Sequence, residues 1–279
     1  MKIYQVDAFA KELFQGNPAA VVPLKAWLPD ALMQNIAMET NLADTAFLVP
    51  SRDGYEIRWF TPAVEVDLCG HATLASGHVL FEHLGFAGDS VVFYSRRSGE
   101  LRVSREPGGD GGMRLSLDLP VNQPREVEGM ASVFEGLRIA PRTLFKGAFD
   151  YMVVLDSRQE VQALEPDFKI LAAAPGRGVV ATARGGAGDE DRADFVSRCF
   201  FPRSGIDEDP VTGSAHTMLV PYWAGLLGKT RLSAVQLSRR RGYLDCLLAG
   251  DRVRMSGYAK TFLTGELCLP EMGEQKSRL

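Results

Sequence analysis

Two short segments, half a chain apart, carry residues whose types and spacing fit acid–base chemistry on a small anion. They are residues 69–73 (CGHAT) and 212–216 (TGSAH), and each begins a stretch that predicts a buried helix. Their glycines, Gly70 and Gly213, are 213 − 70 = 143 residues apart in a chain of 279, as two similar half-chains would give. A helix start presents unpaired backbone N–H groups and a partial positive charge, and it therefore attracts an anion.

Carboxylates precede both segments, Glu65 and Asp67 in the first case and residues 207–209 (DED) in the second. If the two helix starts face each other, Gly70, Gly213 and Ser214 are candidates to bind the carboxylate of a small molecule, with acid and base groups at its edges. Ser214 could equally be an ordinary N-cap, a role that does not exclude contact with a ligand.

Composition and charge narrow the class of protein. The chain is 46% hydrophobic and can bury a large core, so two domains of ordinary size are expected. Its net charge is −4 and it has no long basic run, which argues against nucleic acid as the main partner. The only dense cationic cluster, residues 239–241 (RRR), is interpreted as a solvated loop between strands.

Targeting signals are not visible in the sequence. The first residues form neither a basic nor an apolar leader pattern, and no apolar run approaches the roughly 18 residues needed to span a membrane. The four cysteines show no C-x-x-C pairing, which favours reduced thiols over a disulfide framework or a structural zinc site. We therefore expect a cytoplasmic protein that does not bind a membrane.

The hydrophobic pattern predicts the elements that must position these residues. Helices are expected over residues 30–41, 72–84 and 214–227, although Pro221 inside the last conflicts with a straight helix. A strand is expected over residues 46–49, which puts Asp44 at its entrance, a place from which a side chain can reach a cleft.

A polar, proline-bearing stretch at residues 120–124 predicts the boundary between two domains. The N-terminal domain covers residues 1–120, possibly joined by a C-terminal strand at about 260–272, and the C-terminal domain covers residues 121–260. Each half is expected to be a curved, mostly antiparallel sheet wrapped around one buried helix, which gives the fold class α+β.

Several longer motifs, in order along the chain, resemble a known family. They are residues 7–9 (DAF), 16–21 (GNPAAV), 41–47 (NLADTAF), 58–62 (RWFTP), 69–73 (CGHAT) and 208–216 (EDPVTGSAH). The chain resembles the PhzF-like proteins of the diaminopimelate-epimerase-like superfamily. The resemblance implies two pseudo-symmetric domains, each with a curved mixed sheet or barrel around a central helix, and a ligand cleft between them. It also implies a homodimer with no metal and no organic cofactor.

The resemblance further implies a reaction in which a carboxylate removes a proton from carbon and returns it elsewhere. It carries the catalytic roles to Asp44, His71 and Asp209, and substrate binding to the two glycines and the serine named above. Asp44 stands where the family has glutamate. The shorter side chain retracts the carboxylate by about 1.5 Å, one C–C bond, so the cleft or the substrate is expected to differ from that of the glutamate members.

Each candidate also has a structural interpretation. Asp44 could be a turn residue, His71 a polar group at a helix start, and Asp209 a turn former before proline. Cys69 is adjacent to Gly70, and superfamily racemases use two opposed thiols, but the second half has Thr212 at the corresponding place. A cysteine-based racemase is therefore disfavoured.

The sequence thus predicts a cofactor-independent isomerase that relocates a proton on a small carboxylate-bearing metabolite. Three alternatives remain open: an epimerase with a second acid on the opposite face, a metabolite-binding protein without turnover, and a protein–protein interaction module. The substrate itself cannot be inferred from the sequence.

Overall fold

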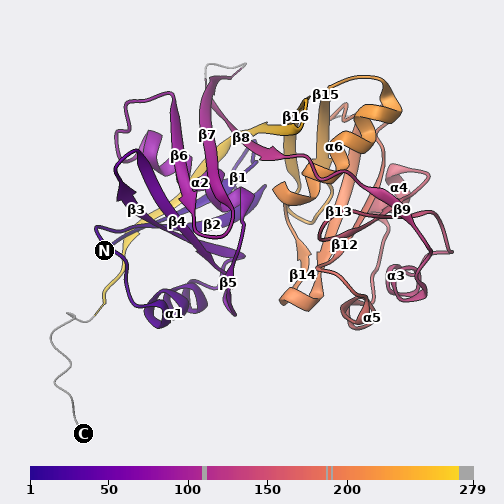
Figure 1. Ribbon diagram of the computed structural model, residues 1–279, viewed down its shortest axis with the longest axis horizontal. Coiled ribbons are helices and arrows are strands. Elements are labelled where there is room, and N and C mark those ends of the chain that lie inside the picture. The colour runs from indigo at the N-terminus through magenta and orange to yellow at the C-terminus, as the bar shows by residue number, and fades with distance from the viewer. Residues whose placement is uncertain (109–111, 187, 190, 270–279) are drawn as a thin grey trace, which may run out of the picture.

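The chain folds into two halves that lie side by side (Figure 1). This computed structural model describes residues 1–108, 112–186, 188–189 and 191–269. The elements of the first part of the chain are β1 (Lys2–Ala8), β2 (Asn17–Pro23), α1 (Asp30–Thr40), β3 (Asp44–Ser51), β4 (Gly54–Phe60), β5 (Glu65–Val66), α2 (Gly70–Glu82), β6 (Ser90–Ser95), β7 (Gly99–Pro107) and β8 (Met113–Pro120).

The second part begins with short elements and ends in long strands. In order, these elements are β9 (Arg125–Val127), α3 (Ala131–Leu137), β10 (Leu144–Lys146), β11 (Tyr151–Val154), α4 (Arg158–Gln162), α5 (Phe168–Ala173), β12 (Val179–Arg184), β13 (Phe195–Phe201), a 3-10 turn (Pro202–Ser204), β14 (Ile206–Asp209), α6 (Gly213–Leu227), β15 (Arg231–Gln236), β16 (Gly242–Ala249), β17 (Arg252–Gly257) and β18 (Ala259–Glu266).

The strand pairings repeat between the halves. In the first, β2 runs parallel to β3, β3 antiparallel to β4, and β4 pairs antiparallel with the short β5 and parallel with β6. In the second, β11 runs parallel to β12, β12 antiparallel to β13, and β13 pairs antiparallel with the short β14 and parallel with β15. The helix α2 follows β5, and α6 follows β14. The predicted α+β class with two pseudo-symmetric halves is confirmed.

The two halves share one continuous sheet. β8 pairs antiparallel with β17, and this ladder joins the halves. From there the ladders lead through the first half to β1 and β18, and through the second half to β10 and β9. The ends β18 and β9 do not pair within the described residues, so the expectation of a barrel is corrected to a curved, open sheet.

The C-terminal strand returns to the N-terminal half. β18 pairs antiparallel with β1 from Ala259 to Glu266, and its yellow ribbon lies along the indigo strand in Figure 1. The last part of the strand expected at about 260–272, residues 270–272, lies outside the described residues. The division of the chain at residue 120 stays a prediction.

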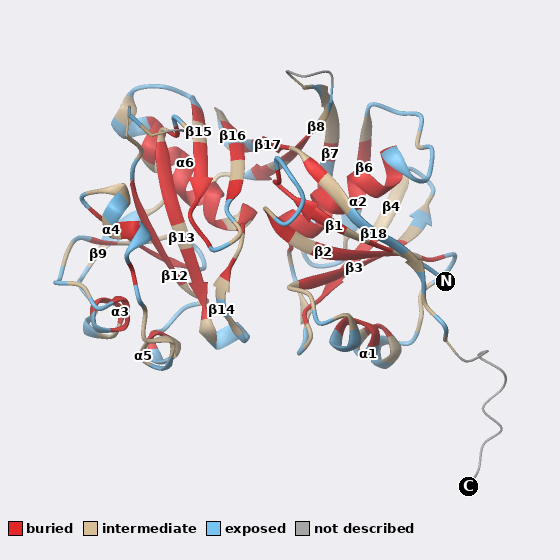
Figure 2. Cartoon of the chain, turned by 180° about the vertical axis from the view of Figure 1, so that it is seen from behind, coloured by how far each residue is buried: buried red, intermediate tan, exposed pale blue. Residues whose placement is uncertain are grey.

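Each half encloses one buried helix, as expected from apolar residues on nearly all sides (Figure 2). In α2, all residues except the last, Glu82, are buried. The second helix, α6, continues through Pro221. Proline lacks the N–H that would bond the carbonyl of Thr217, and that carbonyl instead accepts a hydrogen bond from the backbone N–H of Asn122 at 3.1 Å. The predicted conflict is therefore resolved by a contact from outside the helix.

Local backbone geometry brings Asp44 to the start of its strand. Helix α1 ends at Asn41, which adopts the left-handed conformation with φ 50°. The chain then turns directly into β3, where Asp44 is the first residue and lies opposite Ala19 of β2. Asp44 thus stands at a strand entrance, as the sequence predicts.

The interpretation of residues 239–241 as a solvated loop is wrong for Arg240. Its guanidinium donates to the carboxylate of Asp7 at 2.8 Å, and Asp7 is only 1% exposed. A buried carboxylate needs such a partner, so Arg240 anchors its loop against β1. No helix in the described part of the chain is both long and apolar enough to cross a membrane.

Candidate active site

A cavity of about 570 Å³ opens where the two halves meet, and both halves line it. All six predicted site residues contribute to its wall: Asp44, Gly70, His71, Asp209, Gly213 and Ser214. The sequence therefore selected residues that the fold brings together. Their individual roles remain predictions.

The first turns of α2 and α6 abut at their glycines. A Cβ atom added to Gly70 would lie 3.4 Å from the Cα of Gly213, and the reverse contact has the same distance. The residues before the glycines, Cys69 and Thr212, are extended and cap neither helix with a side-chain hydrogen bond. The N–H groups of both first turns are therefore available to an anion in the cavity.

The acidic residues before α2 are paired with arginines. Glu65 accepts two hydrogen bonds from Arg58, at 2.7 and 2.8 Å, and Asp67 accepts one from Arg97. Both carboxylates line the cavity. Because their charges are balanced by arginine, neither fits the role of the principal base.

Asp44 lines the cavity without an arginine or lysine partner in the described part of the chain, and unlike Asp209 it has an oxygen that accepts no hydrogen bond there. It is 6% exposed, and its Oδ1 has no hydrogen-bond partner among the described residues. Burial raises its pKa to about 7, with a hydrogen bond from Cys69 opposing the rise and the nearby charge of Asp209 adding to it. A carboxyl group that titrates near neutrality can both accept and return a proton at physiological pH.

The neighbours of His71 define which ring nitrogen carries its hydrogen. Its Nδ1 lies 3.1 Å from the amide nitrogen of Asn17, a donor that accepts no hydrogen bond. The same amide nitrogen also reaches Asp209 Oδ1 and the Val211 carbonyl, and with a donor facing Nδ1 the tautomer that carries its hydrogen on Nε2 is favoured. Burial lowers the pKa of His71 to about 3, so the ring is neutral and carries one hydrogen, on Nε2 in the favoured tautomer. Nε2 lies 3.8 Å from Oδ2 of Asp44, too far for a direct hydrogen bond, so both atoms can contact a third atom beside them in the cavity.

Asp209 is fixed in place by its own half and by the first half. Asn17 donates to its Oδ1 at 2.7 Å, and the hydroxyl of Thr212 donates to its Oδ2 at 2.5 Å. Burial raises the pKa of Asp209 to about 6 although both of these hydrogen bonds lower it. This use of the Thr212 hydroxyl also explains why Thr212 does not cap α6. Asn17 was part of a recognised motif but was not predicted as a site residue.

Replacing Asn17 is expected to destabilise the protein more at pH 8 than at pH 5. In Asn17→Ala, Asp209 loses the hydrogen bond that stabilises its charged form, and this loss counts only where Asp209 is ionised. We expect the free energy of unfolding to fall by about 1–3 kcal/mol at pH 8 and by less at pH 5, as measured by urea denaturation. Asn122→Ala removes an amide that contacts a backbone N–H instead, and its effect should not depend on pH. An equal loss for Asn17→Ala at both pH values would contradict this account.

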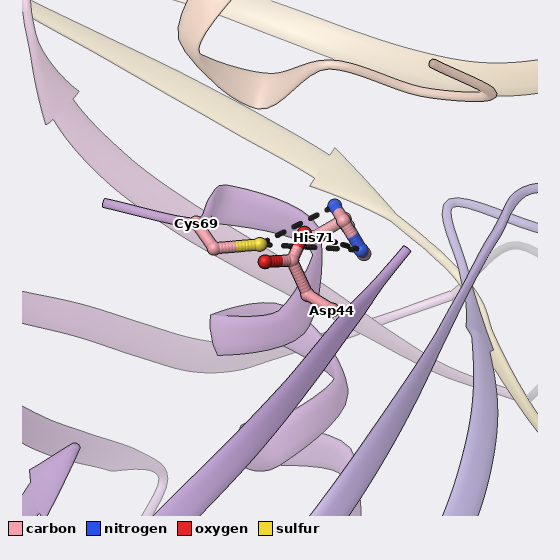
Figure 3. A group of neighbouring side chains, drawn as sticks. All are labelled: Asp44, Cys69 and His71. Carbon is pink, nitrogen blue, oxygen red and sulfur yellow. Dashed lines mark hydrogen bonds and ion pairs between the residues drawn. The ribbon is translucent and has the colours of Figure 1, made fainter. Parts of the chain in front are cut away.

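Cys69 lies beside Asp44 and His71 (Figure 3). These three residues offer ligand atoms within 4.8 Å of one another. However, Sγ of Cys69 is almost equally far from the two ring nitrogens, 3.5 Å from Nδ1 and 3.9 Å from Nε2. A shared metal would lie on the lone pair of one nitrogen and hold the sulfur much nearer to that nitrogen than to the other. The geometry of the trio does not match a metal shared by the sulfur and one ring nitrogen.

The thiol of Cys69 is also unsuited to act as a base. Burial and the nearby charge of Asp44 raise its pKa well above the usual value, so it stays protonated. Thr212 lies at the corresponding place in the second half, as expected from the sequence. The expectation that the protein is not a two-thiol racemase stays a prediction.

Sequence reasoning missed the cationic side of the cavity. Arg177, just before β12, lines the cavity and donates to the buried carboxylate of Asp150 at 2.9 Å and to Oγ of Ser214 at 2.8 Å. No motif marks Arg177 or Asp150. The repeat between the halves could have pointed to Arg177. β12 is the counterpart of β3, and Arg177 lies just before β12 as Asp44 lies at the start of β3.

The cavity thus holds a buried carboxylate with an oxygen unpartnered among the described residues, together with two helix starts that carry no side-chain cap. Comparison with known proteins then shows to which family the chain belongs. The family model described as phenazine biosynthesis-like protein matches residues 6–265. A protein of Pseudomonas aeruginosa named as an uncharacterized isomerase is 52% identical over 270 residues, covering 96% of this chain and 99% of the relative. A human phenazine biosynthesis-like domain-containing protein is 36% identical over 288 residues, covering 96% and 99%.

The chain therefore belongs to the phenazine biosynthesis-like protein family, and by this relationship it is an isomerase. A PhzF family protein of Enterococcus faecalis superimposes with a TM-score of 0.88 at 45% identity, covering 96% of this chain and 99% of that one. A probable proline racemase of Agrobacterium radiobacter has a TM-score of 0.64 at 11% identity, covering 97% and 94%, and shares the fold alone. The predicted diaminopimelate-epimerase-like fold is confirmed.

Proposed function

We propose that the protein is a cofactor-independent isomerase that moves a proton from one carbon to another on a small carboxylate-bearing molecule. The observation that carries this proposal is the environment of Asp44, a buried carboxylate with a pKa near 7 and one oxygen that has no partner among the described residues. Such a group is costly to bury and is typical of a functional site.

In this mechanism, the substrate carboxylate lies against the uncapped first turns of α2 and α6. The substrate carries a carbon–carbon double bond beyond the carbon next to its carboxylate. Asp44 removes a proton from that adjacent carbon, negative charge develops on the carboxylate oxygens, and the double bond shifts toward the carboxylate when a more distant carbon is protonated. Backbone N–H groups next to Gly70 and Gly213 stabilise that charge as an oxyanion hole does. The Nε2–H group of His71 donates toward the substrate or toward Asp44. The proton on Asp44 exchanges with solvent, and Asp44 then protonates another carbon on the same face.

The geometry favours this one-base isomerisation over an epimerisation. Inversion at carbon needs an acid on the face opposite to the base. The place that corresponds to Asp44 in the second half is next to Arg177, whose guanidinium stays protonated and cannot exchange a proton. Asp209 has both oxygens in hydrogen bonds with Asn17 and Thr212. One mobile acid–base group therefore supports movement of the proton on a single face.

Incubation of the purified protein with a panel of unsaturated and 2-amino carboxylic acids in heavy water tests the proposal. Proton NMR should detect one deuterium in a substrate whose double bond has moved. Exchange with inversion at a single carbon would instead favour the epimerase. If no acid in the panel exchanges a C–H proton while a carboxylate still binds, the protein is a metabolite-binding protein.

The pH dependence of the reaction is expected to report the burial of Asp44. Because the base must be ionised, kcat/KM should rise with pH to a plateau, with an apparent pKa near 7 that belongs jointly to Asp44 and Asp209. A profile measured from pH 4 to 9 checks this. A midpoint near the value of free aspartate, about 3.9, would show that the base is not in this buried environment.

A further inference from the structure

The guanidinium of Arg177 is held rigidly at the second-half wall of the cavity. Asp150, which is 1% exposed, accepts from its Nε at 2.9 Å and also from its Nη2. The rings of Phe149 and Phe201 lie at 5.5 and 5.0 Å from its central carbon. A two-pronged ion pair and two aromatic contacts fix both the position and the plane of the group.

This fixed guanidinium determines what the hydroxyl of Ser214 can do. The second hydrogen of Nη2 points to Ser214 Oγ, 2.8 Å away. Arginine has no acceptor and is never deprotonated in proteins, so Oγ must be the acceptor of this bond. Within the described residues, Oγ of Ser214 forms this hydrogen bond alone. Its own hydrogen therefore has no protein acceptor and turns toward the cavity that Ser214 lines.

We propose that Arg177 is a positioning residue that makes Ser214 a hydroxyl donor to the carboxylate of the bound substrate. An acceptor bond from a cation polarises the hydroxyl and strengthens the bond that it donates. The donated hydrogen lies beside the uncapped first turn of α6, so hydroxyl and backbone N–H groups form one carboxylate subsite. Arg177 itself already has Asp150 as its counterion, and it acts through Ser214. This inference rests on the proposed carboxylate substrate.

The asymmetry between the halves supports this assignment. At the entrance of β3 the first half presents Asp44, and before β12 the second half presents Arg177. An ionised Asp44 repels a substrate carboxylate, whereas Arg177 on the other wall, through Ser214, offers it a hydroxyl donor. The subsite would hold the carboxylate at the second-half side, with the carbon that loses its proton directed to Asp44.

A double-mutant cycle with a carboxylate probe tests the coupling. The probe is para-fluorobenzoate, and para-fluorobenzamide is its neutral analogue of the same shape; dissociation constants come from fluorine NMR titrations. Ser214→Ala and Arg177→Met are each expected to weaken benzoate binding by roughly 10- to 100-fold, as loss of a hydrogen bond to a charged group would. In the Ser214→Ala background, Arg177→Met should weaken benzoate binding by less than about a further twofold. Binding of the benzamide should change little in any variant.

Two further variants keep the test valid if Arg177→Met folds poorly, because that change leaves the buried Asp150 unpaired. Asp150→Asn with Arg177→Gln removes both charges and should weaken benzoate as Arg177→Met does. Arg177→Lys keeps one donor and should restore part of the affinity. Arg142→Met is the matched control, an arginine of similar exposure that is paired with two carboxylates away from the cavity, and it should leave binding unchanged.

Two results would overturn the proposal. One is an equal loss of benzoate affinity for Arg177→Met in the wild-type and in the Ser214→Ala backgrounds, which would mean that the two side chains act separately. The other is absence of benzoate binding to the unmodified protein at millimolar concentration. Asp44→Asn separates this inference from the proposed function, because it should bind benzoate while it strongly slows proton exchange. If that variant exchanges normally, the function fails and the subsite can still stand.

Discussion

Asp44→Asn is expected to lower the rate of deuterium incorporation by about 10²- to 10⁴-fold, the usual contribution of a general base. Asparagine keeps the size and the burial of the side chain but accepts no proton. Its effect should fall on kcat, because the groups that would hold the substrate carboxylate, the first turns of α2 and α6, are unchanged. NMR-detected exchange in heavy water under saturating substrate measures it.

Two other carboxylate variants define what this result means. Asp44→Glu restores the side-chain length that the family resemblance implies, and it should retain exchange because a proton acceptor is still present. Asp67→Asn changes a carboxylate on the same cavity wall that is already paired with Arg97, and the rate should change less than about threefold. Unchanged exchange in Asp44→Asn, or an equal loss in Asp67→Asn, would remove Asp44 from the mechanism.

The sequence predicted the parts of the site that depend on local patterns. Gly70 and Gly213 follow short segments with the composition of a helix start, and their spacing alone indicated two similar halves. Asp44 was placed at a strand entrance from the end of one helix and the start of the next apolar run. Each of these inferences needs only neighbours along the chain, and the structure brings these residues to one cavity.

The sequence could not predict partners that meet across the fold. Asn17 and Asp209 are 192 residues apart and form one hydrogen bond, and Arg177 reaches Ser214 across 37 residues. Such contacts depend on the three-dimensional path of the sheet. The prediction of a solvated loop was wrong at Arg240 for the same reason, because its buried partner Asp7 lies near the other end of the chain. The perturbed pKa of Asp44 likewise follows from burial that only the packed structure defines.

The burial that tunes Asp44 should also make the wild-type protein less stable than Asp44→Asn above neutral pH. Between the pKa of an unfolded aspartate, 3.8, and about 7, the folded state binds more protons at this site than the unfolded state. The free energy of unfolding of the wild type must therefore fall as pH rises through this window, and asparagine lacks this dependence. Three pKa units correspond to at most about 4 kcal/mol, so we expect Asp44→Asn to gain about 2–4 kcal/mol at pH 8.

Urea denaturation of both proteins at pH 4.5 and pH 8 measures this difference. At pH 4.5 most of the gain should vanish, because the wild-type carboxyl group is then neutral in the folded state and the unfolded state is only partly ionised. Asp67→Asn, at an exposed and paired position, should differ from wild type by a small amount that barely changes with pH. If the Asp44→Asn difference is the same at both pH values, Asp44 is not held in a low-dielectric cavity. In that case the physical basis for a neutral-pH base at this position is lost, whatever the activity of the variant.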